Sequence, residues 1–155
     1  MMTIQTLQAA LPTYLAPWVQ ALGLKVHAFD DQSVTLRLPQ NAQLSRTSGM
    51  VCGQAMMAAA DSAMVLALIN HFGAFKPCTT VQMSSSFLKP LSGQDALIQA
   101  RVIRAGKSLA FGEIDMLGAD DGKSVSRFTT TYALLRGQGA ATVSPQCLPG
   151  HGPRR

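Results

Sequence analysis

The sequence is poor in charge, in aromatic side chains and in cysteine. Asp, Glu, Lys and Arg together make up 14% of the 155 residues, and Phe, Trp and Tyr make up 6%. A monomer that exposes its whole surface usually carries more charge than this. The low fraction therefore predicts that part of the surface is covered in a homo-oligomer, either a homodimer or a homotetramer.

The three cysteines, Cys52, Cys78 and Cys147, have neither the number nor the spacing of a disulfide framework or a zinc site. We therefore expect no metal, and a reducing, cytoplasmic environment. The amino terminus lacks the basic and apolar regions of a secretory signal. The one long apolar run contains a carboxylate and has no flanking charges, so we expect no membrane association.

Basic residues exceed acidic ones, 13 to 8, which gives a formal net charge of +5. The excess favours an anionic partner, but the Lys and Arg residues are dispersed along the chain. A nucleic-acid-binding module usually gathers its basic residues on one element and interleaves them with aromatic side chains. The pattern thus argues against nucleic acid and favours a small phosphorylated ligand.

The hydrophobic periodicity predicts one α+β domain over residues 1–136, followed by an irregular, Gly- and Pro-rich tail at 137–155. Residues 4–22 have helical spacing interrupted at Pro12 and Pro17. They predict two short helices that form an amino-terminal cap over residues 1–22.

Alternating apolar residues at 24–28 and 34–38 predict an opening β-hairpin, and residues 40–52 read as a polar loop. An apolar helix follows from residue 53 and stops at Gly73. Four further strands are predicted at 79–88, 95–104, 109–117 and 125–135, joined in sequence as a meander. The expected architecture is an antiparallel sheet that curls around the long helix.

Asp61 is the one carboxylate in the apolar helical run that begins at Gly53. A helix that is apolar on every side should be buried nearly all round, and ionised carboxylates are rarely buried without a partner. Desolvating a carboxylate is one way in which proteins prepare a general base or a nucleophile. The alternative is a structural Asp that is hydrogen-bonded to Ser62 or to a neighbouring loop.

Four segments resemble the hot-dog-fold acyl-CoA thioesterases, in their phenylacetic-acid-degradation (PaaI-like) branch. Gly49–Gln54 is similar to the family's Gly-x-x-His-Gly-Gly segment at the helix start, with Asp61 nine positions after the His slot. Thr80–Met83 leads into Phe87–Pro90, which is similar to a strand ending in Phe-Leu-Arg-Pro, and Arg101–Phe111 resembles the family's hairpin. The resemblance covers residues 20–136 and implies the hot-dog fold.

The resemblance also implies thioester hydrolysis, with Asp61 as general base or nucleophile. The first turn of a helix has backbone N–H groups without intrahelical partners, at the positive end of the helix dipole. The N–H of Gly53 is therefore our candidate oxyanion donor, with a packing glycine as the alternative. By the same resemblance, Thr80 of the other subunit orients the water or the carboxylate, unless it is an ordinary strand residue.

Two positions depart from the family pattern, because Cys52 stands in the His slot and Arg46 where an Asn is common. A thiol is a weaker hydrogen-bond donor than imidazole, so the departure predicts poorer polarisation of the substrate. A cysteine at a helix start can also be a reactive thiolate, although an inert buried cysteine is the commoner case.

The implied ligand is coenzyme A, as part of the substrate and not as a cofactor. Lys89 and the hairpin residues Arg104, Gly106 and Lys107 are candidates to bind its phosphates, the alternative being that they are solvated surface charges. We expect an acyl-CoA thioesterase. A noncatalytic acyl-CoA sensor is the first alternative, and an enoyl-CoA hydratase or dehydratase is the second.

Overall fold

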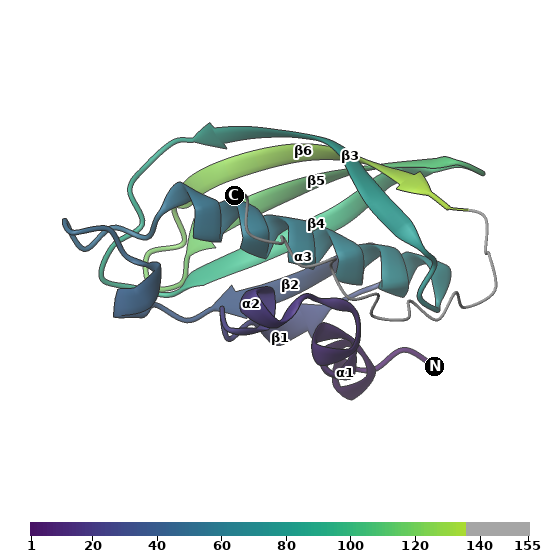
Figure 1. The fold of residues 1–155 in the computed structure, drawn as a ribbon, viewed down its shortest axis with the longest axis horizontal. Helices are drawn as coiled ribbons and strands as arrows, with labels where there is room; N and C mark the ends of the chain where they lie inside the picture. The colour runs from purple at the N-terminus through teal and green to yellow at the C-terminus, as the bar shows by residue number, and fades with distance from the viewer. Residues whose placement is uncertain (136–155) are drawn as a thin grey trace, which may run out of the picture.

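A curved six-stranded antiparallel sheet wraps around one long helix, α3 (Gly53–Phe72), in the computed structural model of the chain (Figure 1). The structure describes residues 1–135. The predicted tail at 137–155 and the predicted domain boundary at 136 therefore lie outside the described residues. Within residues 1–135, the fold is the α+β, hot-dog arrangement that the sequence predicts.

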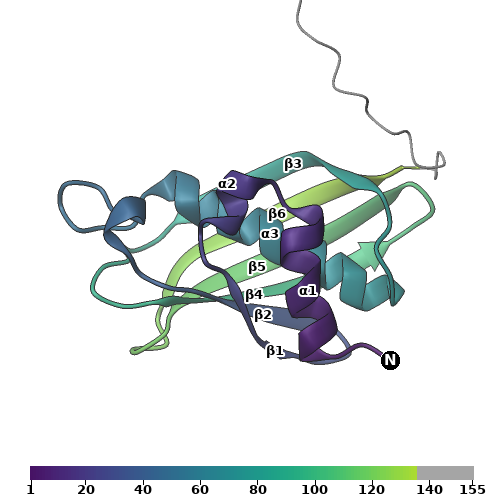
Figure 2. The same ribbon diagram turned by 60° about the horizontal axis from the view of Figure 1, so that its bottom comes forward.

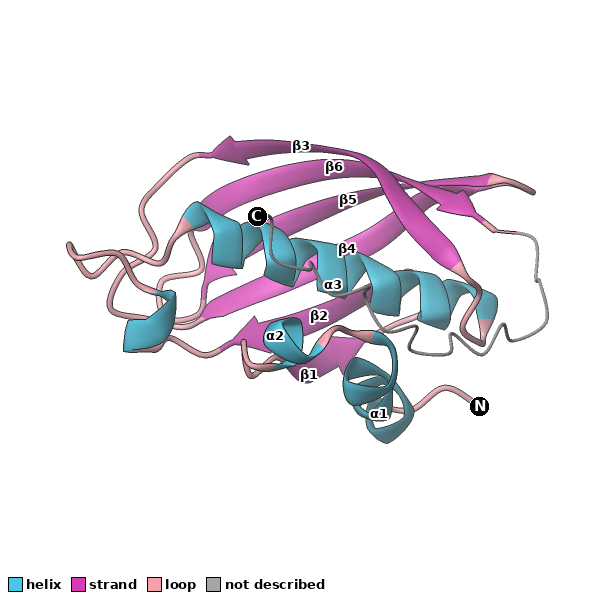
Figure 3. Ribbon diagram, in the orientation of Figure 1, coloured by secondary structure: helices cyan, strands magenta, loops and turns pink. Residues whose placement is uncertain are grey.

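The strands lie close to the predicted ranges. The sheet order is β1-β2-β4-β5-β6-β3, with every neighbouring pair antiparallel (Figure 3). Alternation of buried and exposed side chains is clearest in β5, where every second residue from Ala110 to Gly118 is buried and the positions between them are partly or fully exposed. The strands are β1 (Lys25–Phe29), β2 (Ser33–Leu38), β3 (Cys78–Phe87), β4 (Ala96–Ala105), β5 (Leu109–Gly118) and β6 (Ser124–Leu134).

The predicted four-strand meander is wrong at β3, which pairs with β6 at the sheet edge and not with β4. β4 pairs instead with β2. The connection between β3 and β4 is therefore not a tight hairpin. Its Leu91 is buried and accepts a hydrogen bond from the N–H of Val51, just before α3. This tie holds the connection at the helix start, and one long edge of β3 has no partner strand among residues 1–135.

Two short helices form the amino-terminal part, as predicted. Helix α1 (Ile4–Tyr14) packs against β1 and α3, and α2 (Pro17–Gln20) follows it (Figure 2). The predicted interruption at Pro12 is wrong, because Pro12 lies inside α1. The chain leaves helical geometry at Leu15 and Ala16, the residues before Pro17, and Pro17 begins α2. Proline disfavours helical geometry in the residue before it and is well tolerated at a first helical position.

The apolar helix α3 is buried on most sides, against β2, β4 and β5, and Gly73 ends it in the left-handed conformation with φ 73°. The expectation of burial nearly all round is wrong. One stripe stays partly exposed, and Met57 on it is 40% exposed. The stripe, which we call the open stripe, consists of Gln54, Met57, Ala58, Asp61 and Val65. Helix α3 is long and apolar enough to span a membrane by length and composition, but in this fold it is the core helix.

Close packing of α3 on the sheet depends on Gly112 in β5. A Cβ atom placed on Gly112 would lie 2.3 Å from the thioether of Met64 and 3.1 Å from the carbonyl oxygen of Arg101. Met64 is fully buried, so its side chain has little room to move aside. The helix and the sheet therefore approach closely at Gly112, where β5 carries no side chain that would meet Met64.

We predict that Gly112→Ala lowers the free energy of unfolding by about 1–3 kcal/mol, because it overpacks the site that Met64 fills. In a Met64→Ala background the same change should cost clearly less. Urea unfolding of the four chains in this double-mutant cycle measures both values. Equal costs of Gly112→Ala in the two backgrounds would mean that Met64 does not press on this position.

Candidate functional site

Asp61 lies halfway along the open stripe, where its side chain meets two hydroxyl groups from the sheet. The Thr80 hydroxyl on β3 donates a hydrogen bond to Asp61 Oδ1 at 2.9 Å. The phenol of Tyr132 on β6 donates to the same oxygen, and it also lies 3.1 Å from the main-chain carbonyl oxygen of Asp61. Among the described residues, no hydrogen bond reaches Oδ2. One carboxylate oxygen is thus held and the other is open.

The sheet brings these two donors side by side. Thr80 is the direct cross-strand partner of Tyr132, and the register shifts immediately afterwards, between Thr80 and Gln82. The extra residue in this β-bulge is Val81, which is 59% exposed at the sheet edge. Bulges often re-aim side chains beside functional sites. Here the bulge follows directly after Thr80, an exposed residue whose hydroxyl nevertheless reaches Asp61.

The prediction that Thr80 reaches the site from another subunit is wrong for its contact with Asp61. Both residues belong to one chain and share a hydrogen bond. The reason is the sheet order, which places β3 beside β6 and over the middle of α3, where a meander would have placed it beside β4. Asp61, Thr80 and Tyr132 therefore form one unit within each protomer, which we call the Asp61 cluster.

The two ionisable groups beside the Asp61 carboxylate, Tyr132 and Cys78, keep their protons and are neutral. Burial raises the pKa of the Tyr132 phenol well above its usual value, and the nearby Asp61 charge raises it further. The same two causes, burial first and Asp61 second, raise the pKa of the half-buried Cys78 thiol. A phenol and a thiol that keep their protons can donate to a carboxylate but cannot compete with it for negative charge.

The start of α3 opens on a cavity of about 430 Å³. Cys52 is the N-cap residue, but its side chain makes no capping hydrogen bond, and Gly53 is the first helical residue. A Cβ atom on Gly53 would lie 3.3 Å from the ring of Phe87, which also lines the cavity. The absence of a side chain at Gly53 thus lets the Phe87 ring pack close to the helix start. The cavity lining consists of Arg46, Met50, Val51, Gly53, Met56, Phe87, Leu88, Lys89, Pro90 and Leu91.

One protomer does not bring Gly53 and Asp61 together. Asp61 lies eight positions after Gly53 on the same straight helix, which separates the two residues by about 12 Å. Asp61 is also absent from the lining of the cavity at the helix start. A substrate carbonyl that binds at Gly53 is therefore out of reach of the Asp61 carboxylate of the same chain.

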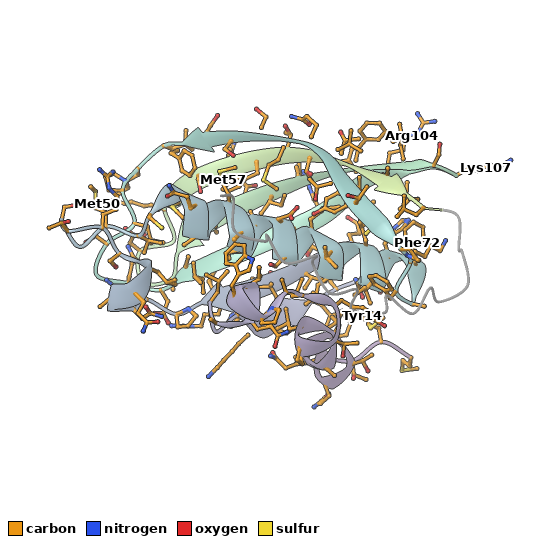
Figure 4. All side chains as sticks on the ribbon, in the orientation of Figure 1. Tyr14, Met50, Met57, Phe72, Arg104 and Lys107 are labelled. Carbon is orange, nitrogen blue, oxygen red and sulfur yellow. The ribbon has the colours of Figure 1, made fainter. Side chains whose placement is uncertain are left out.

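The predicted phosphate-binding residues also divide into two groups. Lys89 lines the cavity at the helix start and forms an ion pair with Asp121 at 3.0 Å. Arg104 and Lys107 lie at the opposite end of the molecule from Met50, another cavity residue (Figure 4), and Gly106 lies between them in the β4–β5 turn. These residues do not form one surface within a protomer.

Two residues of the site were not predicted as functional ligands or donors. Tyr132 occupies an inward position of β6, where it is 1% exposed. A tyrosine, whose hydroxyl group needs a hydrogen-bond partner, at a core position of a strand is the signal that could have identified it. Arg46 appeared in the sequence only as a departure from the family pattern, yet it lines the same cavity as Lys89. In the described part of the chain, no group of three or more His, Cys, Asp or Glu side chains could hold a metal ion.

We predict that Asp61→Asn speeds the alkylation of Cys78 by iodoacetamide at neutral pH. Removing the carboxylate charge lowers the pKa of the Cys78 thiol and so increases the reactive thiolate fraction. The measurement uses chains in which Cys52 and Cys147 are serine, with and without Asp61→Asn. Cys52 in a Cys78→Ser, Cys147→Ser chain is the control, and its rate should not change. An unchanged Cys78 rate would contradict an ionised Asp61 beside this thiol.

Comparison with known proteins places this geometry in a family. Residues 48–125, which include α3 and the Asp61 cluster except Tyr132, match the model of the "Thioesterase superfamily". The chain is 22% identical over 120 residues to the putative esterase Ta0293 of Thermoplasma acidophilum, covering 77% of this chain and 89% of that protein. It is 27% identical over 121 residues to the putative esterase PA1618 of Pseudomonas aeruginosa, covering 76% and 82% of the two chains.

Solved structures agree with the fold. The crystal structure of a mutant of thioesterase PA1618 aligns with a TM-score of 0.76 at 23% identity, over 87% of this chain and 95% of that one. The PaaI protein of the Escherichia coli phenylacetic acid degradation operon aligns with a TM-score of 0.73 at 18% identity, over 87% and 98% of the two chains. The resemblance predicted from the sequence is confirmed, and the PaaI-like branch is consistent with these neighbours. The chain belongs to the thioesterase superfamily.

Proposed function

We propose that this protein hydrolyses acyl-CoA thioesters to a free acid and coenzyme A. The observation that carries the proposal is the Asp61 carboxylate, which Thr80 and Tyr132 hold through Oδ1 while Oδ2 stays open at a partly exposed stripe. A carboxylate fixed in this way is equipped to take a proton from water or to attack a carbonyl carbon. Family membership supports a hydrolase of thioesters or esters.

In the general-base route, Asp61 Oδ2 takes a proton from a water molecule, whose oxygen attacks the thioester carbonyl carbon. The carbonyl oxygen becomes an oxyanion, which the N–H of Gly53 stabilises at the positive end of the α3 dipole. The C–S bond then breaks, and the departing thiolate takes up the proton. In the nucleophilic route, Oδ2 attacks the carbonyl carbon and the C–S bond breaks, which gives a mixed anhydride and the coenzyme A thiolate. Water then hydrolyses the anhydride to the free acid and the Asp61 carboxylate, and the proton that is released goes to the thiolate. Both routes need the same free oxygen.

The two halves of this chemistry come from different chains in a homodimer. Because Gly53 and Asp61 of one protomer are separated along α3, we propose that Asp61 faces Gly53 of the partner subunit. Two features of the protomer support such a dimer. The open stripe leaves Met57 exposed on an otherwise apolar helix, and the β3 edge carries the exposed Val81. Unpaired strand edges and exposed apolar surface are typical of interfaces.

Coenzyme A carries phosphates, and the formal charge of +5 favours it. Arg46 and Lys89 lie at the cavity beside Gly53, where they suit charge-assisted contacts. Lys89 is already paired with Asp121, so Arg46 is the more available of the two. In a dimer, Arg104 and Lys107 of the second chain are the candidates for additional phosphate contacts.

Asp61→Asn should lower thiol release from a panel of acyl-CoA substrates by about a hundredfold or more, which is typical for removal of a positioned base. The amide keeps the shape of the carboxylate but cannot accept the proton. Colorimetric detection of free coenzyme A measures the rate, and calorimetric titration measures binding of the same thioesters. Normal turnover in a folded Asp61→Asn chain would reject the mechanism.

Cys52→Ser is the companion variant, since it keeps a small donor and removes thiolate chemistry. Its turnover should stay near that of the parent. If Cys52→Ser abolishes turnover and Asp61→Asn does not, the cysteine is the nucleophile. Binding of acyl-CoA without thiol release in the parent supports the sensor, and addition of water to an enoyl-CoA supports the hydratase.

Gly53→Pro tests the oxyanion donor, because proline removes the N–H at a position where helices accept it. The preceding residue, Cys52, already has the extended geometry that proline requires, with φ −72° and ψ 149°. We expect the variant to fold and to lose turnover by on the order of a hundredfold, as for other oxyanion-hole donors. Gly53→Ala, which keeps the N–H, is the matched control and should retain more activity.

Mixing the Gly53→Pro and Asp61→Asn chains tests whether the site is shared. After the two variants are unfolded and refolded together, random pairing should restore up to roughly a quarter of the parent rate, because half of the dimers are mixed and each has one intact site. Each variant refolded alone is the control. A mixture that is no more active than its components would contradict a site built from Gly53 of one chain and Asp61 of the other.

A further inference from the structure

Tyr132 is a buried phenol whose oxygen contacts the reacting residue at two points. Its ring is packed in the core, 1% exposed, at an inward position of β6. The hydroxyl group lies against both the carboxylate and the main-chain carbonyl of Asp61, a residue 71 positions earlier in the chain. Among the described side chains, only that of Tyr132 has hydrogen bonds to both groups of Asp61. Tyr132 therefore ties the Asp61 side chain to the fixed frame of helix and sheet.

A free aspartate carboxylate has no strong preference for one rotation about its terminal bond. A tyrosine ring in a packed core, by contrast, has few degrees of freedom, so the position of its hydroxyl group is set by the fold. The contact with Tyr132, supported by the 2.9 Å contact with Thr80, selects one rotation of the carboxylate. Both donors point to the same oxygen, and the rotation that they select leaves Oδ2 open.

We propose that Tyr132 is a positioning residue for the hydrolytic reaction, which holds Asp61 through Oδ1 so that Oδ2 is the oxygen that acts on water or substrate. This inference rests on the proposed function. It adds a specific role to a residue of the carboxy-terminal strand, outside the segment that matches the family model. It also assigns the two oxygens of Asp61 different tasks.

Tyr132 can perform this role over the working range of pH, because burial and the neighbouring carboxylate raise the pKa of its phenol and keep it protonated. The ionisable groups that face Asp61 in the described chain are Cys78 from β3 and Tyr132 from β6. Both are neutral at pH 7, so hydrogen bonding and not an ion pair stabilises the carboxylate. Loss of the Tyr132 donor therefore removes a hydrogen bond that holds Oδ1 of Asp61.

Tyr132→Phe removes the donor and keeps the ring. We expect kcat to fall by about tenfold to a hundredfold, as for loss of precise orientation, while KM stays within about twofold because Tyr132 does not touch the substrate. Tyr14→Phe is the matched control, since Tyr14 stacks on Phe75, and it should leave both quantities unchanged. An unchanged kcat in Tyr132→Phe would overturn the proposal, as would a change in KM alone.

A second measurement does not depend on turnover or on the folding of Tyr132→Phe. The chain has two tyrosines, so Tyr132 is the single tyrosine of the Tyr14→Phe protein. With ¹³C at Cζ of tyrosine, its resonance should show no ionisation near pH 10, and it should move in Asp61→Asn at neutral pH because the partner of the phenol changes from a carboxylate to an amide. A resonance that titrates as an ordinary tyrosine and is unmoved by Asp61→Asn would overturn the proposal.

The two measurements separate failure of this inference from failure of the proposed function. If the parent releases no thiol from any thioester, the proposed function fails, and the Cζ resonance alone decides whether Tyr132 holds the Asp61 carboxylate. If the parent is an active hydrolase and the resonance is unmoved by Asp61→Asn, the function stands and the role of Tyr132 is rejected.

Discussion

Packing of the apolar helix α3 against the concave side of the sheet is the constraint on which the rest of the structure depends. Most of the helix is buried there, and its Met64 lies directly against Gly112 of β5. Burial fixes the rotation of α3 about its axis, because the apolar positions must face β2, β4 and β5. That rotation leaves Asp61 at the border between core and surface, opposite β3 and β6. A carboxylate at such a border can accept hydrogen bonds from the sheet on one side while its other side is open to a substrate.

The same rigidity divides the chemistry between the start and the middle of the helix. The start of α3 offers unpartnered backbone N–H groups and a cavity at Gly53, whereas the carboxylate lies two turns further on. A straight helix cannot bring these two parts together, and we propose that a second chain completes the site. The low charge content, the open stripe on α3 and the edge of β3 that no described strand pairs with are three aspects of this one proposal, a protein that works as a dimer.

Much of the fold was predictable because its signals are local. Strand alternation gave the strand positions closely, Gly73 ends the helix, and Pro17 starts α2 as its fixed φ allows. The sheet order was not predictable from neighbouring segments, since the position of β3 depends on a buried Leu91 and a hydrogen bond to the loop before α3. For the site, Asp61 stands out as a charge in an apolar run. Tyr132 does not stand out, because only the register of β6 with β3 places its hydroxyl group beside Asp61.

The most direct test of the account is a crystal structure with a non-hydrolysable acyl-CoA analogue in which a methylene group separates the carbonyl from sulfur. The account predicts that the ketone oxygen accepts a hydrogen bond from the N–H of Gly53 of one chain. Oδ2 of Asp61 from the other chain should face the carbonyl carbon directly or through one water molecule, with Oδ1 still held by Thr80 and Tyr132. An analogue bound away from α3, or one whose carbonyl is approached by Oδ1 after the Tyr132 contact has broken, would contradict it.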